Sequence, residues 1–71
     1  MAETVTLNRL KVALVERRIT SKWLAAQLGK SESTVSRWAS NTIQPSVEQL
    51  FEIASVLDMD VKDLLNSQAK E

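Results

Sequence analysis

Apolar residues recur every three or four positions along most of the chain, which is the spacing of amphipathic helices. In the first such segment, Leu7, Leu10 and Leu14 share one side. A further stripe follows Pro45 and consists of Val47, Leu50, Phe51, Ala54 and Leu57. The pattern predicts five helices: residues 7–17, 21–28, 32–40, a segment that starts after Pro45, and residues 61–66.

Short polar residues stand where these helices are expected to begin. The expected caps are Thr20, Ser31, Ser46 and Asp60. Ser46 and Gln49 also fit a capping box, in which the hydroxyl and the amide each satisfy a free backbone N–H group. Gly29 and Asn41 follow the second and third helices, where a residue that accepts a positive φ is favoured. The connections between the helices are therefore expected to be short.

These elements predict an all-α fold, a compact five-helix domain. The chain has 71 residues, which is the size of one small domain. We expect residues 1–71 to form a single domain with an ordered core at about residues 7–66 and short tails at both ends. Each helix is too short to be stable alone, so packing must hold the helices together.

The composition argues against an enzyme and against a metal site. The chain contains no cysteine and no histidine, which removes the commonest metal ligands and acid–base group. Asp58 and Asp60 are interpreted as turn and cap residues, and no cofactor is expected. The longest apolar run, residues 12–15, is far too short for a membrane span, and Met1–Thr4 does not resemble a signal peptide. A cytoplasmic protein without a membrane partner is the expectation.

The net charge is zero, but the charges are unevenly distributed. Residues 1–44 contain seven lysines and arginines against three glutamates, whereas residues 45–71 contain two lysines against six acidic residues. Such asymmetry suggests that one end of the molecule meets a polyanion. Chance variation in a short sequence gives the same pattern, so the asymmetry supports a nucleic-acid partner only together with other features.

The segment from Thr20 to Asn41 has the layout of a helix-turn-helix. Two helices of about eight residues are joined by a turn of roughly three or four residues that contains glycine. Ala25 is small, as is needed where two helices cross closely. The side chains expected to face inward are Leu24, Ala25, Leu28, Val35, Trp38 and Ala39.

The opposite side of the third predicted helix is polar and positively charged. At about 100° per residue, it carries Ser33, Ser36, Arg37 and Ser40. Small hydroxyl side chains allow a helix to lie deep in the major groove of DNA, and arginine reaches both acceptors on a guanine edge. A solvated helix face can have the same composition, so the spacing of the inward residues carries more weight than this face.

Several short runs together resemble the Cro/repressor-type helix-turn-helix family, often called Xre. They are the runs at residues 24–29 (LAAQLG), 33–38 (STVSRW), 44–46 (QPS), 54–57 (ASVL) and 63–65 (DLL). The resemblance extends from about Leu7 to Asn66. It implies a five-helix fold and sequence-specific binding of double-stranded DNA, usually as a dimer, with the third helix as the reader.

The sequence departs from the family pattern at two places. The second helix commonly opens with a glutamine that binds a phosphate, and Ser21 stands there instead. In many members a glutamate and an arginine pair at the positions of Ala39 and Leu14. Both partners are apolar here, and replacing both members of a buried pair can be neutral or stabilising. We therefore expect Leu14 to contact Ala39.

The resemblance implies two sets of DNA contacts. Base edges would be read by Ser31, Glu32, Ser33, Ser36 and Arg37, and Arg37 is the expected partner of a guanine. Phosphates would be held by Thr20, Ser21, Lys22, Ser40, Asn41 and Gln44. The implied activity is that of a transcription regulator, with repression favoured, on a near-palindromic operator.

Other partners remain open from the sequence. Ile53, Val56 and Met59 are expected to leave an apolar patch that suits a homodimer, unless the fifth helix covers them. Trp23 either packs over the stems of neighbouring side chains or contacts DNA or a partner protein. An antitoxin that binds both DNA and a toxin protein, and a protein-interaction module that has lost DNA binding, are the alternatives.

Overall fold

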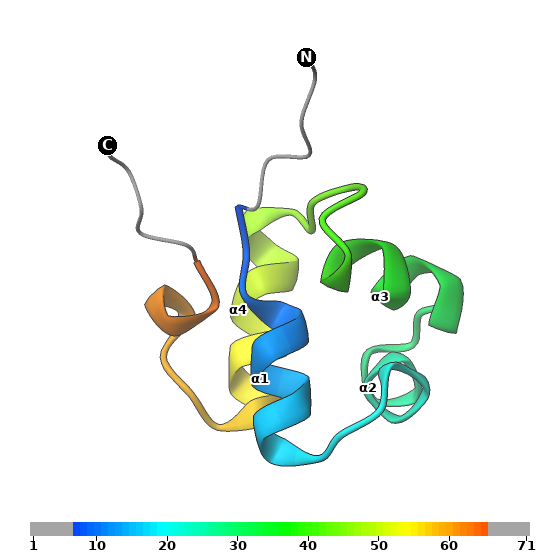
Figure 1. Cartoon of the computed structure of the whole chain (residues 1–71), viewed down its shortest axis with the longest axis horizontal. Helices are drawn as coiled ribbons and strands as arrows, with labels where there is room; N and C mark the ends of the chain where they lie inside the picture. Colours follow the sequence, from blue (N-terminus) through cyan, green and yellow to red (C-terminus); the bar gives the residue numbers. More distant parts are fainter. Residues whose placement is uncertain (1–6, 66–71) are drawn as a thin grey trace.

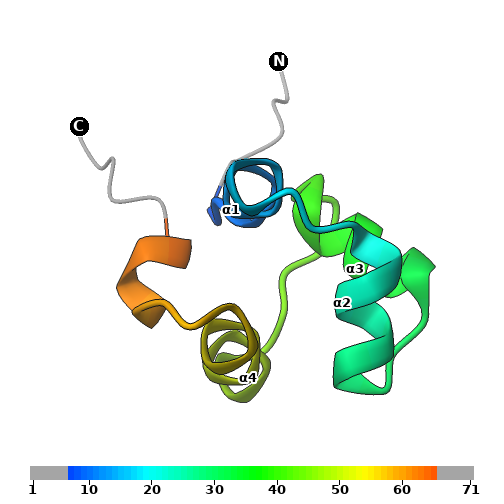
Figure 2. The ribbon, with the colours of Figure 1, turned by 90° about the horizontal axis from the view of Figure 1, so that it is seen from below.

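The computed structural model describes residues 7–65. Its elements are α1 (Leu10–Arg17), α2 (Ser21–Leu28), α3 (Glu32–Ala39), α4 (Val47–Leu57) and a 3-10 helix, η1 (Val61–Leu64). Helices α1 and α4 occupy the middle of the molecule, with α2 and α3 on one side and η1 on the other (Figures 1 and 2). Within residues 7–65 no helix is both long and apolar enough to cross a membrane.

The all-α class is confirmed for the described residues, but the prediction of a fifth α-helix is wrong. The segment predicted as residues 61–66 forms the four-residue η1, and Asn66 lies outside the described residues. Asp60 caps η1 as predicted, because its carboxylate accepts a hydrogen bond from the Lys62 N–H group at 3.1 Å. The Leu64 carbonyl then accepts from the Arg9 N–H group at 2.7 Å. This pairing draws the chain into an extended conformation at Leu65 and ends the helix.

The first helix begins three residues later than predicted, because the segment before it also pairs with the end of η1. Asn8 forms an isolated antiparallel bridge with Leu65, so the helix cannot include Asn8. The Asn8 side chain then accepts a hydrogen bond from the Leu10 N–H group at 3.0 Å. Leu7, predicted on the inner side of the helix, is about half exposed.

The starts of α2, α3 and α4 are confirmed. The hydroxyls of Thr20, Ser31 and Ser46 each accept a hydrogen bond from a backbone N–H group of the first turn. Ser46 and Gln49 form the complete capping box. Helix α3 ends at Ala39, one residue earlier than predicted, with Ser40 as its C-cap.

One hydrophobic core joins all five elements. Its buried members are Leu10, Ala13, Leu14, Leu24, Ala25, Val35, Trp38, Ile53, Ala54, Leu57 and Leu64. The predicted inward residues of the helix-turn-helix are confirmed, since Leu28 and Ala39 also pack against this core. Arg17 adds a polar tie between α1 and the end of α4, because its Nε donates to the Leu57 carbonyl at 3.3 Å.

The predicted apolar stripe of α4 is wrong at two positions. Val47 is 68% exposed and Phe51 is 58% exposed, whereas Ile53 is completely buried. The core side of α4 consists of Leu50, Ile53, Ala54 and Leu57, with Val56 at its edge. These core residues have the same three- and four-residue spacing as the predicted stripe. Because α4 is apolar over much of its circumference, the spacing alone did not show which side is buried.

Candidate nucleic-acid interface

Helices α2 and α3 are joined by a tight turn that the sequence determines locally. Gly29 ends α2 in the left-handed region, at φ 69°. No atom lies within 4 Å of the position that a Cβ of residue 29 would take, so glycine is favoured here by its backbone conformation and not by space. The Lys30 N–H group then donates to the Ala25 carbonyl at 2.9 Å. Ser31 begins α3 directly after this turn.

Helix α3 rests on the rest of the domain through Val35 and Trp38. Val35 is completely buried and Trp38 is 2% exposed. Their burial fixes the rotation of α3 about its own axis, because the two residues lie three positions apart on one side. The side of α3 that carries the predicted base-reading residues must therefore face outward.

The outward side of α3 brings together four of the five predicted base-reading residues. Glu32, Ser33, Ser36 and Arg37 are all exposed, and together they line one open hollow. We call these four residues the reader face. A guanidinium beside small hydroxyl side chains on an exposed helix can reach donors and acceptors in a groove without steric obstruction.

Ser31, the fifth predicted base-reading residue, lies at the start of α3 and caps it. Its hydroxyl oxygen accepts from the Thr34 N–H group at 3.1 Å and lies 2.9 Å from the Thr34 hydroxyl. Thr20 has the same role in α2, where its hydroxyl accepts from the Trp23 N–H group at 3.0 Å. A hydroxyl that accepts a capping bond still has its own proton to donate. Both residues are exposed.

The predicted phosphate contacts divide into two groups. Thr20, Ser21 and Lys22 lie together at the start of α2, and Lys22 is exposed. Ser40 lies at the end of α3, where its hydroxyl donates to the Arg37 carbonyl at 3.2 Å and lies 2.7 Å from the Thr42 hydroxyl. Asn41 and Gln44 lie in the following loop and take part in a hydrogen-bond network within the protein.

This network is centred on Asn8, a residue that the sequence analysis did not single out. Asn8 is 2% exposed. Its amide nitrogen donates to the Trp38 carbonyl at 3.0 Å and to the Gln44 side-chain oxygen at 2.7 Å. Its backbone N–H group donates to the Asn41 side-chain oxygen at 3.0 Å, and the Asn41 amide donates back to the Asn8 carbonyl at 3.2 Å. We call Asn8, Asn41 and Gln44 the asparagine clamp.

The asparagine clamp changes the interpretation of Asn41 and Gln44. The Gln44 amide nitrogen donates to the Asn41 side-chain oxygen at 3.0 Å, so both side chains already have internal partners. Their polar groups hold the end of α3 against the chain that leads into α1. The role of Asn8 in the clamp has no local sequence signal, because its partners Trp38 and Gln44 lie 30 and 36 residues away.

The predicted dimer patch is wrong at its first member. Ile53 is completely buried in the core, so it offers no surface to a partner. Val56 and Met59 are partly buried and pack against the core. Trp23 is 45% exposed on α2, whereas the next two residues, Leu24 and Ala25, are buried.

Leu14 and Ala39 lie on neighbouring helices, and the direct contact between them stays a prediction. Leu14 is 5% exposed, and Ala39 packs against the core from α3. Both line the same hollow between α1 and α3. Their joint replacement leaves no charged group buried at this place, which avoids the desolvation penalty of a broken pair.

The supported turn between α2 and α3, together with the outward reader face, defines a helix-turn-helix protein. The chain belongs to the Cro/C1-type HTH DNA-binding domain family, whose model matches residues 9–70. DNA binding is therefore its general function, and the resemblance noted in the sequence is confirmed.

A solved structure gives a second, independent match. The protein superposes with a TM-score of 0.83 on the crystal structure of a Bacteroides fragilis protein described as a candidate DNA-binding protein. The two sequences are 52% identical, and the match covers 84% of this chain and 97% of the other. No curated protein matches the chain.

Proposed function

We propose that this protein regulates transcription by binding a specific sequence in double-stranded DNA. The observation that carries the proposal is the reader face, where Glu32, Ser33, Ser36 and Arg37 line an open hollow on the outer side of α3. Helix α3 enters the major groove, and Arg37 contacts a guanine. Thr20, Ser21, Lys22 and Ser40 contact phosphates and set the register.

The protein acts without chemistry, by occupying a promoter, and repression is the favoured outcome. It binds as a homodimer, which places two α3 helices about 34 Å apart on a near-palindromic site. An inverted repeat of two half-sites in the selected DNA supports the dimer. A single half-site with one protein per duplex contradicts it.

The test is selection of bound sequences from random duplexes, followed by affinity measurements on the selected site. Arg37→Ala is expected to relax the preference at one base pair and to weaken binding to the selected site by about 1–3 kcal/mol. Binding to random duplex should weaken less, because the guanine contact is made only on the selected site.

Lys62→Ala is the matched control for the loss of a positive charge. Lys62 is exposed on η1, which lies on the far side of the molecule from α3 (Figure 1). The Lys62→Ala variant should bind the selected and the random duplex with the affinities of the wild type. If Arg37→Ala lowers the affinity for selected and random DNA equally, Arg37 is a phosphate contact. If the wild type retains no duplex at low salt, the proposed function is wrong.

A further inference from the structure

A groove runs between α1 and α3, beside the reader face. It consists of two adjoining hollows that share Lys11, Ala39 and Ser40. Its floor includes Leu14 and the small Ala39. We call this feature the α1–α3 groove. None of the predicted DNA contacts lies on α1, so this groove adds an element to the candidate interface.

The α1–α3 groove is chemically suited to an anion. Lys11 lines both of its hollows, Ser21 and Ser36 add hydroxyls to one, and Arg9 lies in the other. Neither hollow has an acidic residue among its described lining residues. Cationic and hydroxyl groups without a carboxylate are the side chains that bind phosphate.

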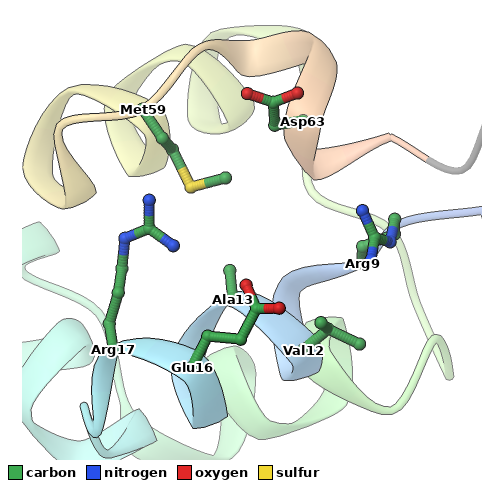
Figure 3. Close-up of a pocket in the computed structure, with 7 residues that line it drawn as sticks. All are labelled: Arg9, Val12, Ala13, Glu16, Arg17, Met59 and Asp63. Atoms are coloured by element: carbon green, nitrogen blue, oxygen red, sulfur yellow. The ribbon is translucent and has the colours of Figure 1, made fainter.

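The other side of α1 differs from this groove. A hollow between α1 and the segment after α4 contains Arg9 and Arg17, but also the carboxylates of Glu16 and Asp63 (Figure 3). These carboxylates would repel a phosphate that approached this hollow. The carboxylate-free side of α1 is thus the side that faces α3.

The groove is also continuous with the reader face. Ser36 lines both the groove and the hollow of the reader face. Asn41 borders the other end of the groove, where the asparagine clamp holds it in place. When α3 lies in the major groove of DNA, the sugar–phosphate backbone at the edge of that groove would therefore lie against the α1–α3 groove of the protein.

We propose that the α1–α3 groove holds the sugar–phosphate backbone of DNA and that Lys11 contacts a phosphate there. This proposal rests on the proposed function and adds α1 to the DNA-binding surface. Because a phosphate contact carries no base information, Lys11 contributes equally to binding of every sequence.

The experiment measures how the affinity of the full chain for duplex DNA depends on salt, on the selected site and on a random duplex. Each neutralised phosphate contributes about 0.9 to the slope of log K against log salt. Lys11→Gln should therefore lower the magnitude of the slope by about one. It should weaken binding about fivefold at 0.15 M salt on both duplexes, and the preferred sequence should stay unchanged.

Two further variants separate a phosphate contact from a structural effect. Lys11→Arg keeps the charge and should keep the wild-type slope. Lys62→Gln removes a charge from η1, and its slope should also stay unchanged. All variants should show the wild-type unfolding midpoint, because Lys11 is exposed.

Two results would overturn the proposal. An unchanged slope for Lys11→Gln shows that the side chain meets no phosphate. An altered base preference makes Lys11 a base contact instead. If the wild type binds with a steep salt dependence while Lys11→Gln and Lys62→Gln behave alike, only this proposal fails. Absence of any wild-type binding would remove the proposed function as well.

Discussion

At the residue scale, the buried side chain of Asn8 connects three parts of the molecule: the start of α1, the end of α3 and the loop that contains Gln44. Its side-chain oxygen accepts a hydrogen bond from the Leu10 N–H group at the start of α1, and its amide nitrogen donates to the Trp38 carbonyl and to Gln44. The Trp38 carbonyl lies near the end of α3, where the helix leaves carbonyl groups without helical partners. A single buried amide thereby ties the start of α1 to the end of the helix that carries the reader face.

Replacing Asn8 should reveal this role as a loss of stability. Asn8→Ala removes three side-chain hydrogen bonds, to the Leu10 N–H group, the Trp38 carbonyl and the Gln44 side chain. We expect the free energy of unfolding to fall by about 1–3 kcal/mol, measured by urea denaturation. Ser33→Ala on the exposed face of α3 is the control, with a change within about 0.5 kcal/mol. An unfolding curve of Asn8→Ala that overlays the wild type would contradict the role given to the clamp.

At the element scale, local and distant interactions determine different boundaries. The starts of α2, α3 and α4 were predictable because Thr20, Ser31 and Ser46 act on backbone groups within the next turn. The start of α1 and the end of η1 were not predictable, because they depend on pairing between the segments around Asn8 and Leu65. No local pattern in the sequence records a bridge between residues so far apart.

The turn between α2 and α3 gives an element-scale prediction. Gly29→Ala places a Cβ on a residue with φ 69°, and the left-handed conformation costs an L-residue about 1–2 kcal/mol. Thermal unfolding should show a lower midpoint. Gly29→Asn is the matched variant and should lose less, since asparagine tolerates this conformation. Because space around the missing Cβ is open, equal losses for both variants would contradict a purely conformational cause.

At the scale of the whole molecule, the candidate interface illustrates what periodicity can and cannot provide. The reader face follows from the rotation of one helix, since burial of Val35 and Trp38 turns Arg37 outward. The α1–α3 groove needs two helices placed side by side, and nothing within α1 alone marks Lys11 as a neighbour of Ser40. Likewise, the buried Ile53 and the exposed Phe51 exchange their predicted places, because only the packed neighbours decide which side of α4 is covered.

The separation of charge along the sequence is also a separation in space. Most lysines and arginines among the described residues lie on α1, α2 and α3 or directly beside these helices, whereas the acidic residues are concentrated on α4, η1 and the turn between them. Helix α3 and η1 lie on opposite sides of the molecule (Figure 2). Such a dipole turns the reader face toward a polyanion during approach, and it influences the association rate more than the final contacts.

Neutralising acidic groups on α4 and at its C-cap should therefore speed association without changing specificity. Glu52→Gln combined with Asp58→Asn keeps the side-chain shapes, and asparagine is compatible with the positive φ of residue 58. We expect the association rate with duplex DNA, measured by stopped-flow fluorescence, to rise a few fold at low salt. The gain should shrink at physiological ionic strength, where the Debye length is about 8 Å. The ratio of affinities for selected and random duplex should stay constant, because neither residue lies on the reader face. A changed ratio, or a gain that persists at high salt, would mean that α4 itself contacts the DNA.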